Sequence, residues 1–319
     1  MKQPLIILTG PTAVGKTDLS IKLAGAIDGE IISADSMQVY RHMDIGSAKV
    51  TREEMGGIPH YLIDVLEPDQ DFNVVSFQSM AKEALNEIYS HGHIPIIAGG
   101  TGFYIQALLY DIDFTENDGD SSIRRELEAL AVSEGERAPL ILHSMLQKAD
   151  PKAAADIHPN NIKRVIRAIE YFRQTGERIS LHNERAHAKE SPYNFLYYVV
   201  TTERDQLYRR IENRVDRMLE QGLVEEVQRL KAMGCHRGQT SMQGLGYKEI
   251  LDYLNGECSL DEAVYRLKRD TRHFAKRQLT WFKRERDVRW IHLPDFQGDL
   301  SLALERMIED CINQGIVIQ

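Results

Sequence analysis

The chain has few of the features that mark secreted, disulfide-linked or membrane-spanning proteins. Its three cysteines, Cys235, Cys258 and Cys311, are far apart and lack metal-ligand spacing. This usage predicts a reducing, cytoplasmic compartment. No apolar run approaches the length of a membrane span, and Gly10 interrupts the N-terminal segment too early for a secretory signal. We therefore expect no membrane partner.

Positive charge is also scarce overall. The formal net charge is −9, which argues against a nucleic-acid partner if the charge is evenly spread. It is not evenly spread, because residues 268–289 contain nine Lys or Arg and only three Asp or Glu. The remaining composition, 42% hydrophobic and 27% charged, is ordinary for a globular protein. A chain of 319 residues can form one large domain or a core with one substantial insertion.

The most specific pattern present is a phosphate-binding loop. It follows the apolar run 5–8 and precedes a helical segment, and it matches G-x-x-x-x-G-K-[ST] with Gly10, Pro11, Thr12, Ala13, Val14, Gly15, Lys16 and Thr17. In such loops the backbone N–H groups and the following helix bind phosphate oxygens. Lys16 can reach the terminal phosphates, and the Thr17 hydroxyl can ligate Mg²⁺, the cofactor we expect.

The loop predicts a di- or triphosphate ligand but leaves the reaction open. The phosphate group could be transferred, or it could be the leaving group of another reaction. The alternative, a glycine-rich turn without a ligand, would require neither the lysine nor the hydroxyl.

The order of strands and helices predicts an α/β fold. Strands are expected at 5–8, 30–33, 61–63 and 94–98, with helices at 18–27 and 74–89 between them. This alternation is typical of a P-loop NTPase-like parallel sheet with helices on both faces. Residues 112–193 are charged and helical, without a convincing strand, and a strand at 195–200 rejoins the sheet. We therefore expect a core of residues 1–111 and 194–319, and an inserted all-helical subdomain of residues 112–193.

The C-terminal part of the core is expected to be mainly helical. Helices are predicted at 204–233, 246–254 and 260–284, followed by a strand near 290–291 and a helix at 301–311.

Polar residues follow three of the predicted strands. Asp35 and Ser36 come after 30–33, and Thr101 lies among glycines 99, 100 and 102 after 94–98. Ligands of open α/β sheets lie at the carboxyl ends of strands, so we expect Asp35 and Thr101 near the phosphate loop. Alternatively, Asp35 and Ser36 cap a turn, and the glycines supply positive φ. Asp64 follows 61–63 as a Walker-B acid would, although one acid is a weak signal.

Two basic segments interrupt the acidic background. Lys163 and Arg167 share one face of a helix predicted at 162–175, although a solvated face without a partner is the usual explanation of such a pattern. Residues 276–282 mix bases with Trp281 and Phe282, which suits phosphate contacts and base stacking, unless the aromatic residues belong to the core. The two segments favour an anionic polymer as a partner.

Together these stretches resemble the tRNA dimethylallyltransferases, also called isopentenyl-tRNA transferases. The resemblance includes residues 10–17, 35–40, 43–49, 59–64, 99–102, 158–160 and 276–278, in the family's order and in both the core and the insert. Ser47 stands where the family more often has Thr, and Val14 where Ser is common. Neither departure removes a chemical function.

The resemblance implies transfer of a dimethylallyl group from dimethylallyl diphosphate to N6 of the adenosine 3′ of the tRNA anticodon, with release of pyrophosphate. It implies Asp35 as the base, Thr101 as an orienting hydroxyl and Arg214 as a charge-neutralising group. Without the resemblance, Arg214 would be interpreted as a surface ion-pair partner. The implied contacts with the tRNA anticodon stem-loop are Asp35, Ser36, Met37, Gln38, Thr101, Arg124, Lys163, Arg164, Arg167, Gln243, Gly244, Gly246, Tyr247, Lys248, Lys276, Arg277 and Gln278. We expect a monomer.

Three other functions remain compatible with the sequence. A small-molecule or nucleotide kinase would share the loop, the sheet and a helical lid, but would not need the large basic helical portion. A related enzyme could prenylate free adenine nucleotides. A non-catalytic nucleotide switch or RNA-binding module would keep its activity when Asp35 is replaced by Ala.

Overall fold

The computed structural model describes residues 2–113 and 122–317. The chain divides into two compact units, one made of Met1–Leu109 with Pro192–Gln319 and the other of Tyr110–Ser191. The sequence predicts boundaries at 111/112 and 193/194, in each case two residues further along the chain.

The first unit is built on a parallel sheet, as predicted. Its strands are β1 (Gln3–Thr9), β2 (Gly29–Ala34), β3 (His60–Tyr61), β4 (Ile94–Gly99), β5 (Tyr193–Thr201) and β6 (Val288–His292). They pair in the order β3-β2-β4-β1-β5-β6, with every neighbouring pair parallel. Since β1 lies between β4 and β5, the strand order reverses beside it, and the residues after β1 emerge where α/β sheets bind ligands.

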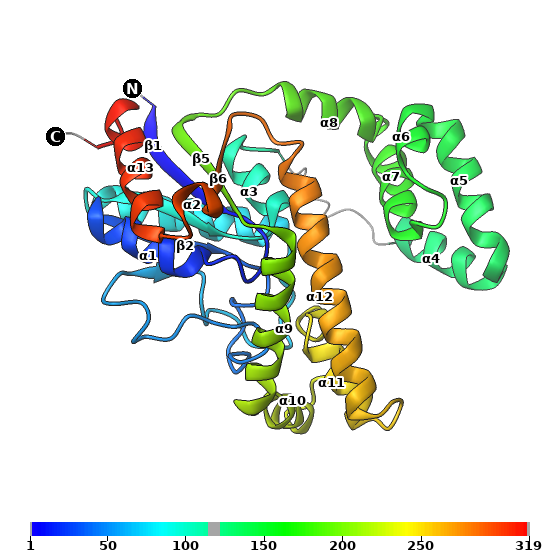
Figure 1. The fold of residues 1–319 in the computed structure, drawn as a ribbon. Helices are drawn as coiled ribbons and strands as arrows, with labels where there is room; N and C mark the ends of the chain where they lie inside the picture. Colours follow the sequence, from blue (N-terminus) through cyan, green and yellow to red (C-terminus); the bar gives the residue numbers. More distant parts are fainter. Residues whose placement is uncertain (1, 114–121, 318–319) are drawn as a thin grey trace. The chain divides into compact units, whose positions relative to one another are not determined.

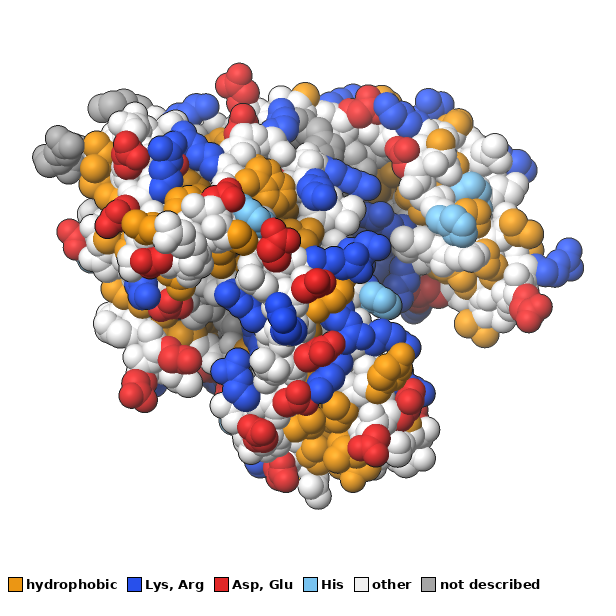
Figure 2. Space-filling view, in the orientation of Figure 1, with side chains coloured by type: hydrophobic (Ala, Val, Ile, Leu, Met, Phe, Trp, Pro, Cys, Tyr) orange, Lys and Arg blue, Asp and Glu red, His pale blue; other side chains and the backbone are white. Residues whose placement is uncertain are grey.

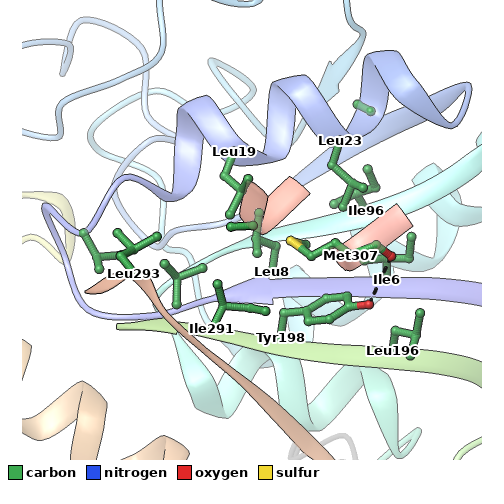
Figure 3. Packing of buried hydrophobic residues seen from close by; sticks show 14 of the residues in the cluster. Ile6, Leu8, Leu19, Leu23, Ile96, Leu196, Tyr198, Ile291, Leu293 and Met307 are labelled. Atoms are coloured by element: carbon green, nitrogen blue, oxygen red, sulfur yellow. Dashed lines mark hydrogen bonds between the residues drawn. The ribbon is translucent and has the colours of Figure 1, made fainter. Parts of the chain in front are cut away.

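Helices cover both faces of this sheet, because β1 is apolar on both sides. Ile6 and Leu8 pack with α1 (Lys16–Ala26) and α13 (Leu300–Asn313) in a cluster that includes Leu19 and Met307 (Figure 3). Leu5 and Ile7, which alternate with them, are also fully buried. A fully buried side chain of this size contributes about 1.5–3 kcal/mol. The helices α2 (Val74–Ser90) and α3 (Gly102–Leu109) complete the N-terminal half.

Four α-helices lie between β5 and β6 in the same unit: α9 (Arg204–Glu220), α10 (Leu223–Ala232), α11 (Tyr247–Leu254) and α12 (Leu260–Phe282). α9 and α12 lie side by side (Figure 1). The single helix predicted at 204–233 is interrupted at Gly222, whose φ of 96° lies in the left-handed region. Single-turn 3₁₀ segments occur at Ser241–Gln243 and Leu293–Phe296.

The second unit contains helices and short connecting segments, and no strand, in its described residues. It consists of α4 (Ser122–Glu134), a 3₁₀ turn (Gly135–Arg137), α5 (Ala138–Ala149), α6 (Pro151–Asp156), α7 (Ile162–Thr175) and α8 (Ile179–Ala188). It has its own core, in which Leu127, Leu142 and Val165 are fully buried. The buried Asp150 carboxylate accepts hydrogen bonds from the backbone N–H groups of Ala153 and Ser180, and thereby joins α6 to α8.

Within the described parts of both units, no helix is long and apolar enough to cross a lipid bilayer.

Candidate active site

The phosphate loop lies between β1 and α1, at the carboxyl edge of the sheet. Gly15, with φ 108°, is the residue immediately before α1. The N–H groups in the first turn of a helix have no partner within the helix, and in α1 they point back toward the loop. Lys16 Nζ donates a hydrogen bond to the Pro11 carbonyl at 2.8 Å. Val14, at the position where a serine is common, is fully buried in the core. The loop is therefore closed by its own lysine and anchored by an apolar side chain.

Two arginines from α9, one turn apart, contact the loop. Arg210 Nη1 donates to the Val14 carbonyl at 3.0 Å, and Arg214 Nη1 donates to Thr12 Oγ1 at 3.3 Å. Burial lowers the pKa of Arg214, the Asp35 carboxylate opposes this effect, and the guanidinium remains charged. The alternative interpretation of Arg214 as a surface ion-pair partner is wrong; on this helix Glu212 instead pairs with Arg272, at 2.6 Å.

The ammonium of Lys16 shares this enclosed environment. Burial and the nearby Arg214 cation lower the pKa of Lys16 to about 7, although the Asp35 carboxylate acts in the opposite direction. In the ligand-free protein, Lys16 is therefore about half protonated near neutral pH.

This pKa predicts proton uptake on ligand binding. A bound pyrophosphate favours the charged lysine, so its pKa rises, and at about pH 8 the largely neutral Lys16 gains a proton. We expect wild-type protein to take up close to one more proton per bound pyrophosphate than Lys16→Arg, whose side chain does not titrate. Calorimetry in two buffers of different ionisation enthalpy measures this difference. Equal uptake by the two proteins would contradict the prediction.

Asp35 follows β2 and lies close to the loop. Its Oδ1 accepts hydrogen bonds from the backbone N–H groups of Met37, at 2.8 Å, and Gln38, at 3.4 Å, so it caps a turn, as the alternative interpretation held. Oδ2 accepts no hydrogen bond from any residue in the described ranges. The charge of Asp35 raises the pKa values of Lys16 and Arg214. The turn-capping role therefore leaves one carboxylate oxygen available beside two cations.

Thr101 lies next to Asp35, as the topology predicts. Gly99 pairs with Ala34 in the β2–β4 ladder, and the Thr101 N–H donates to the Ala34 carbonyl at 3.2 Å. The ends of β1, β2 and β4 thus bring together a lysine, a carboxylate and a hydroxyl from separate parts of the sequence.

Gln278 joins α12 to both loops of the site. Its Oε1 accepts the Thr12 N–H at 2.9 Å, and its Nε2 donates to the Gly100 carbonyl at 3.0 Å. The residue is 6% exposed. A direct contact between Gln278 and tRNA does not fit this structure, because both amide atoms already bind the backbone of the site.

The glycines after β4 allow α12 to approach closely. A Cβ at Gly100 would lie 2.1 Å from Gln278 Nε2, and one at Gly102 would lie 2.2 Å from Trp281 Cδ1. Neither glycine has positive φ, so the alternative that they serve a left-handed turn is wrong. Phe282 is fully buried and the Trp281 ring packs edge-on against Phe103, which confirms the core interpretation of Phe282.

Some residues expected to contact tRNA are exposed in the first unit. Gln243, Lys276 and Arg277 are exposed, and Lys276 forms no ion pair with any residue in the described ranges. Lys248 is half-buried, with Nζ 3.4 Å from Glu249 Oε1. Figure 2 shows Lys and Arg side chains mixed with acidic ones over α9 and α12. Lys276 and Arg277 are therefore exposed cations of the basic segment, and the Arg277 guanidinium lies 5.8 Å from the centroid of the Phe274 ring.

Other expected contacts are buried or already bonded. Gly244, Gly246 and Tyr247 are buried, and the Tyr247 hydroxyl donates to Glu226 at 2.9 Å while accepting the Ser47 N–H. Direct tRNA contacts from these three residues do not fit this structure. Ser36 and Met37 are half-buried. Gln38 is also half-buried, and its amide bonds Ala48 and Ser33. These side chains shape the walls of the site.

Glu226 is a site-supporting residue that the sequence does not reveal. It is buried, and its carboxylate accepts the backbone N–H groups of Asp44, Ile45 and Gly46 at 2.8–3.0 Å. It thereby holds the segment 43–49, one of the stretches that carry the family resemblance. An acid on an amphipathic helix normally faces solvent, so no sequence signal marks this one.

Asp64 does not lie beside the phosphate loop as a Walker-B acid would. β3 ends at Tyr61 instead of residue 63, because Leu62 and Asp64 have φ values of 62° and 56°. Asp64 Oδ1 instead lies 2.5 Å from Lys49 Nζ, which also pairs with Asp44. The Walker-B interpretation is therefore wrong.

Of the four basic residues in the second unit that are expected to contact tRNA, some are already paired with a carboxylate and others are not. Arg124 forms two hydrogen bonds with Glu170, at 2.6 and 3.1 Å, and Arg167 Nη1 lies 3.3 Å from the same carboxylate. Glu170 is 4% exposed. Lys163 and Arg164 are exposed on α7. Two of the four cations therefore stabilise a buried carboxylate, and the other two face solvent.

The fold and the site define a phosphate-loop protein in which the Asp35 carboxylate lies beside the loop. The family model described as IPP transferase matches residues 38–285, and the chain belongs to this family. It is 65% identical over 303 residues to a tRNA dimethylallyltransferase from Lachnoclostridium phytofermentans, with 95% of this chain and 96% of the relative aligned. A relative of the same name from Acetivibrio thermocellus is 50% identical over 295 residues, which span 92% of this chain and 93% of the relative.

Solved structures of tRNA-modifying transferases are also similar to this chain. The full-length tRNA isopentenylpyrophosphate transferase from Bacillus halodurans has a TM-score of 0.73 and 44% identity, over 99% of this chain and 98% of its own. A eukaryotic dimethylallyltransferase whose structures describe its action on tRNA has a TM-score of 0.75 and 30% identity, over 93% of this chain and 72% of its own.

Proposed function

We propose that this protein transfers the dimethylallyl group of dimethylallyl diphosphate to N6 of the adenosine 3′ of the anticodon in tRNA. The observation that supports this most strongly is the available Oδ2 of Asp35 beside a phosphate loop lined by Lys16 and Arg214. Alkylation of an amine by an allylic diphosphate needs a proton acceptor on one side and neutralisation of a leaving diphosphate on the other.

The loop serves the leaving group. As the allylic C–O bond breaks, negative charge develops on pyrophosphate, and the loop N–H groups, Lys16 and Arg214 stabilise it. The Thr17 hydroxyl, next to Lys16 in the first turn of α1, is the kind of oxygen ligand that Mg²⁺ prefers, so the loop fits this ion. When bound there, Mg²⁺ would add further neutralisation of the diphosphate.

Asp35 and Thr101 serve the nucleophile. An adenine amine is weakly nucleophilic, so removal of its proton as the C–N bond forms accelerates the reaction. Oδ2 of Asp35 accepts that proton, while Oδ1 keeps its hydrogen bond to Met37 and fixes the orientation of the carboxylate. The Thr101 hydroxyl orients the nitrogen.

Exposed cations bind the RNA. The target base must leave its stack, at a cost of a few kcal/mol, and phosphate contacts elsewhere offset this cost. We assign such contacts to Lys276 and Arg277 in the first unit and to Lys163 and Arg164 in the second, with Arg124 and Arg167 contributing through the exposed parts of their side chains.

The cellular location that we propose is the cytoplasm. Cys235, Cys258 and Cys311 are free thiols, which is consistent with a reducing compartment.

Lys276→Ala tests the RNA surface. Loss of one phosphate contact reduces the slope of log K against log salt concentration by about one. We therefore expect weaker tRNA binding with a shallower slope, measured by filter binding at several salt concentrations. Arg306→Ala is the control, because Arg306 is an exposed cation on α13 that pairs with Glu309. A slope unchanged from wild type would show that Lys276 does not contact phosphate.

The reaction itself is tested with two labelled donors. The protein is incubated with unmodified tRNA and labelled dimethylallyl diphosphate, and separately with γ-labelled ATP. We expect label in tRNA with the prenyl donor only. Phosphoryl transfer from ATP to an acceptor would favour the kinase and overturn the proposal. Prenylation of AMP in preference to tRNA would instead identify a free nucleotide as the substrate.

A further inference from the structure

A cluster of one carboxylate and two imidazoles lies at the amino edge of the sheet. Glu30 is the second residue of β2, His91 caps the end of α2, and His93 immediately precedes β4. Glu30 pairs with Pro95 in the β2–β4 ladder. Because the strands are parallel, this edge is opposite the one that carries the phosphate loop. The proposed prenyl transfer therefore makes no use of the cluster.

The three side chains converge on one point. His91 Nδ1 lies 3.0 Å and His93 Nδ1 2.5 Å from the same oxygen, Glu30 Oε1. The other oxygen, Oε2, accepts the Tyr61 hydroxyl at 2.7 Å. One ligand atom from each of Glu30, His91 and His93 lies within 4.8 Å of the others. Gly92, with φ 78°, forms the tight turn that aims both rings at the carboxylate.

In this cluster the carboxylate is buried and the two imidazole rings are partly exposed, so an ion can reach the ligands from solvent. The Glu30 side chain is 2% exposed, whereas those of His91 and His93 are 44% and 43% exposed. The carboxylate is thus held from its other oxygen by Tyr61, and the partly exposed rings leave a path for an ion and a water molecule from solvent.

We propose that Glu30, His91 and His93 bind a divalent transition-metal ion of the zinc type. Glu30 Oε1 and the two Nδ1 atoms supply three ligands, and water supplies the fourth. Ligands about 2.0–2.1 Å from Zn²⁺ in a tetrahedral site lie roughly 3.3 Å from one another, so the present hydrogen bonds need to lengthen by less than about 1 Å. Rotation of the two exposed rings would achieve this, and each ring would carry its proton on Nε2 so that Nδ1 can bind the ion.

The donor set selects the kind of metal. Two imidazole nitrogens and one carboxylate oxygen suit Zn²⁺, Ni²⁺ or Cu²⁺, whereas Mg²⁺ prefers oxygen ligands alone. Tyr61 completes the site by holding the metal-bound carboxylate from its other oxygen, as the partners of metal ligands commonly do. The bound ion joins the turn between α2 and β4 to β2, and through Tyr61 to the edge strand β3. Its role is structural.

The test is titration of chelator-treated protein with Zn²⁺ alone. We expect about one equivalent to bind and to raise the midpoint of thermal unfolding, because an ion that binds only the folded state stabilises it. Co²⁺ in place of Zn²⁺ should give the visible absorption of tetrahedral coordination. His91→Asn and His93→Asn keep a side-chain donor near the Nδ1 position but remove an imidazole ligand, and each should abolish binding. His236→Asn, at an exposed histidine outside the cluster, should bind as wild type does.

Two results would overturn the inference: no binding by wild-type protein, or equal binding by wild type and both cluster variants. Prenyl transfer with Mg²⁺, measured on the same samples, serves as an independent readout. It should be retained in His91→Asn and His93→Asn, so its loss from wild type would count against the proposed function and not against the metal site.

Discussion

Asp35→Asn lowers kcat for prenyl transfer by about 10²–10⁴-fold, the usual contribution of a positioned general base, while tRNA affinity changes little. The amide keeps an oxygen at the position of Oδ1, so the hydrogen bond from the Met37 N–H is retained and the turn after β2 is preserved. The substitution replaces Oδ2, the proposed proton acceptor, with an NH2 group that cannot accept a proton. Single-turnover rates and filter-binding affinities separate the two effects.

Asp35→Ala is the matched comparison. It removes both the base and the turn cap, so we expect turnover to be abolished with tRNA affinity still largely retained. The difference between the Ala and Asn variants measures what the cap contributes. A large loss of affinity combined with a near-normal rate in either variant would contradict the assignment of Asp35 as the base.

Arg214→Ala should lower kcat by about 10²–10³-fold, comparable to the loss of one preorganised donor to a developing negative charge. Its guanidinium lies against Thr12 in the phosphate loop, whereas Arg209 on the same helix is exposed. Arg209→Ala is therefore the control and should leave both kcat and pyrophosphate affinity unchanged. Equal effects of the two substitutions would show that Arg214 has no special role at the diphosphate.

The same variant gives a second, independent result. Arg214 is one of the groups that lower the pKa of Lys16, so its removal raises that pKa toward the usual value of a lysine. Lys16 would then be charged before the ligand binds at about pH 8. Proton uptake on pyrophosphate binding should therefore be smaller in Arg214→Ala than in wild type. Unchanged uptake would mean that the two cations do not interact.

The parts of the site that could be predicted from the sequence depend on local pattern and topology. The phosphate loop is a contiguous motif, and the apolar runs around it identify the buried strands. Asp35 and Thr101 follow from a rule of parallel sheets, because the carboxyl ends of β2 and β4 meet at one edge. None of these inferences requires knowledge of which distant side chains meet.

The parts that could not be predicted depend on contacts between distant residues. Gln278 binds a backbone group 266 residues away, and Glu226 binds three N–H groups about 180 residues away. Periodicity indicates which face of a helix is buried, but not which polar group it meets there. For the same reason the sequence could not show that Tyr247 is enclosed, or that Arg124 and Arg167 share Glu170.

The position of Gln278 on α12 has a consequence for the order of events in catalysis. Lys276 and Arg277, two exposed cations, immediately precede the residue whose amide links Thr12 to Gly100. Nucleic acid that binds these two cations restrains this turn of α12. Through Gln278 it also restrains the phosphate loop, where the diphosphate substrate binds in the proposed reaction. We therefore expect the two substrates to bind cooperatively, each increasing the affinity for the other by the same factor.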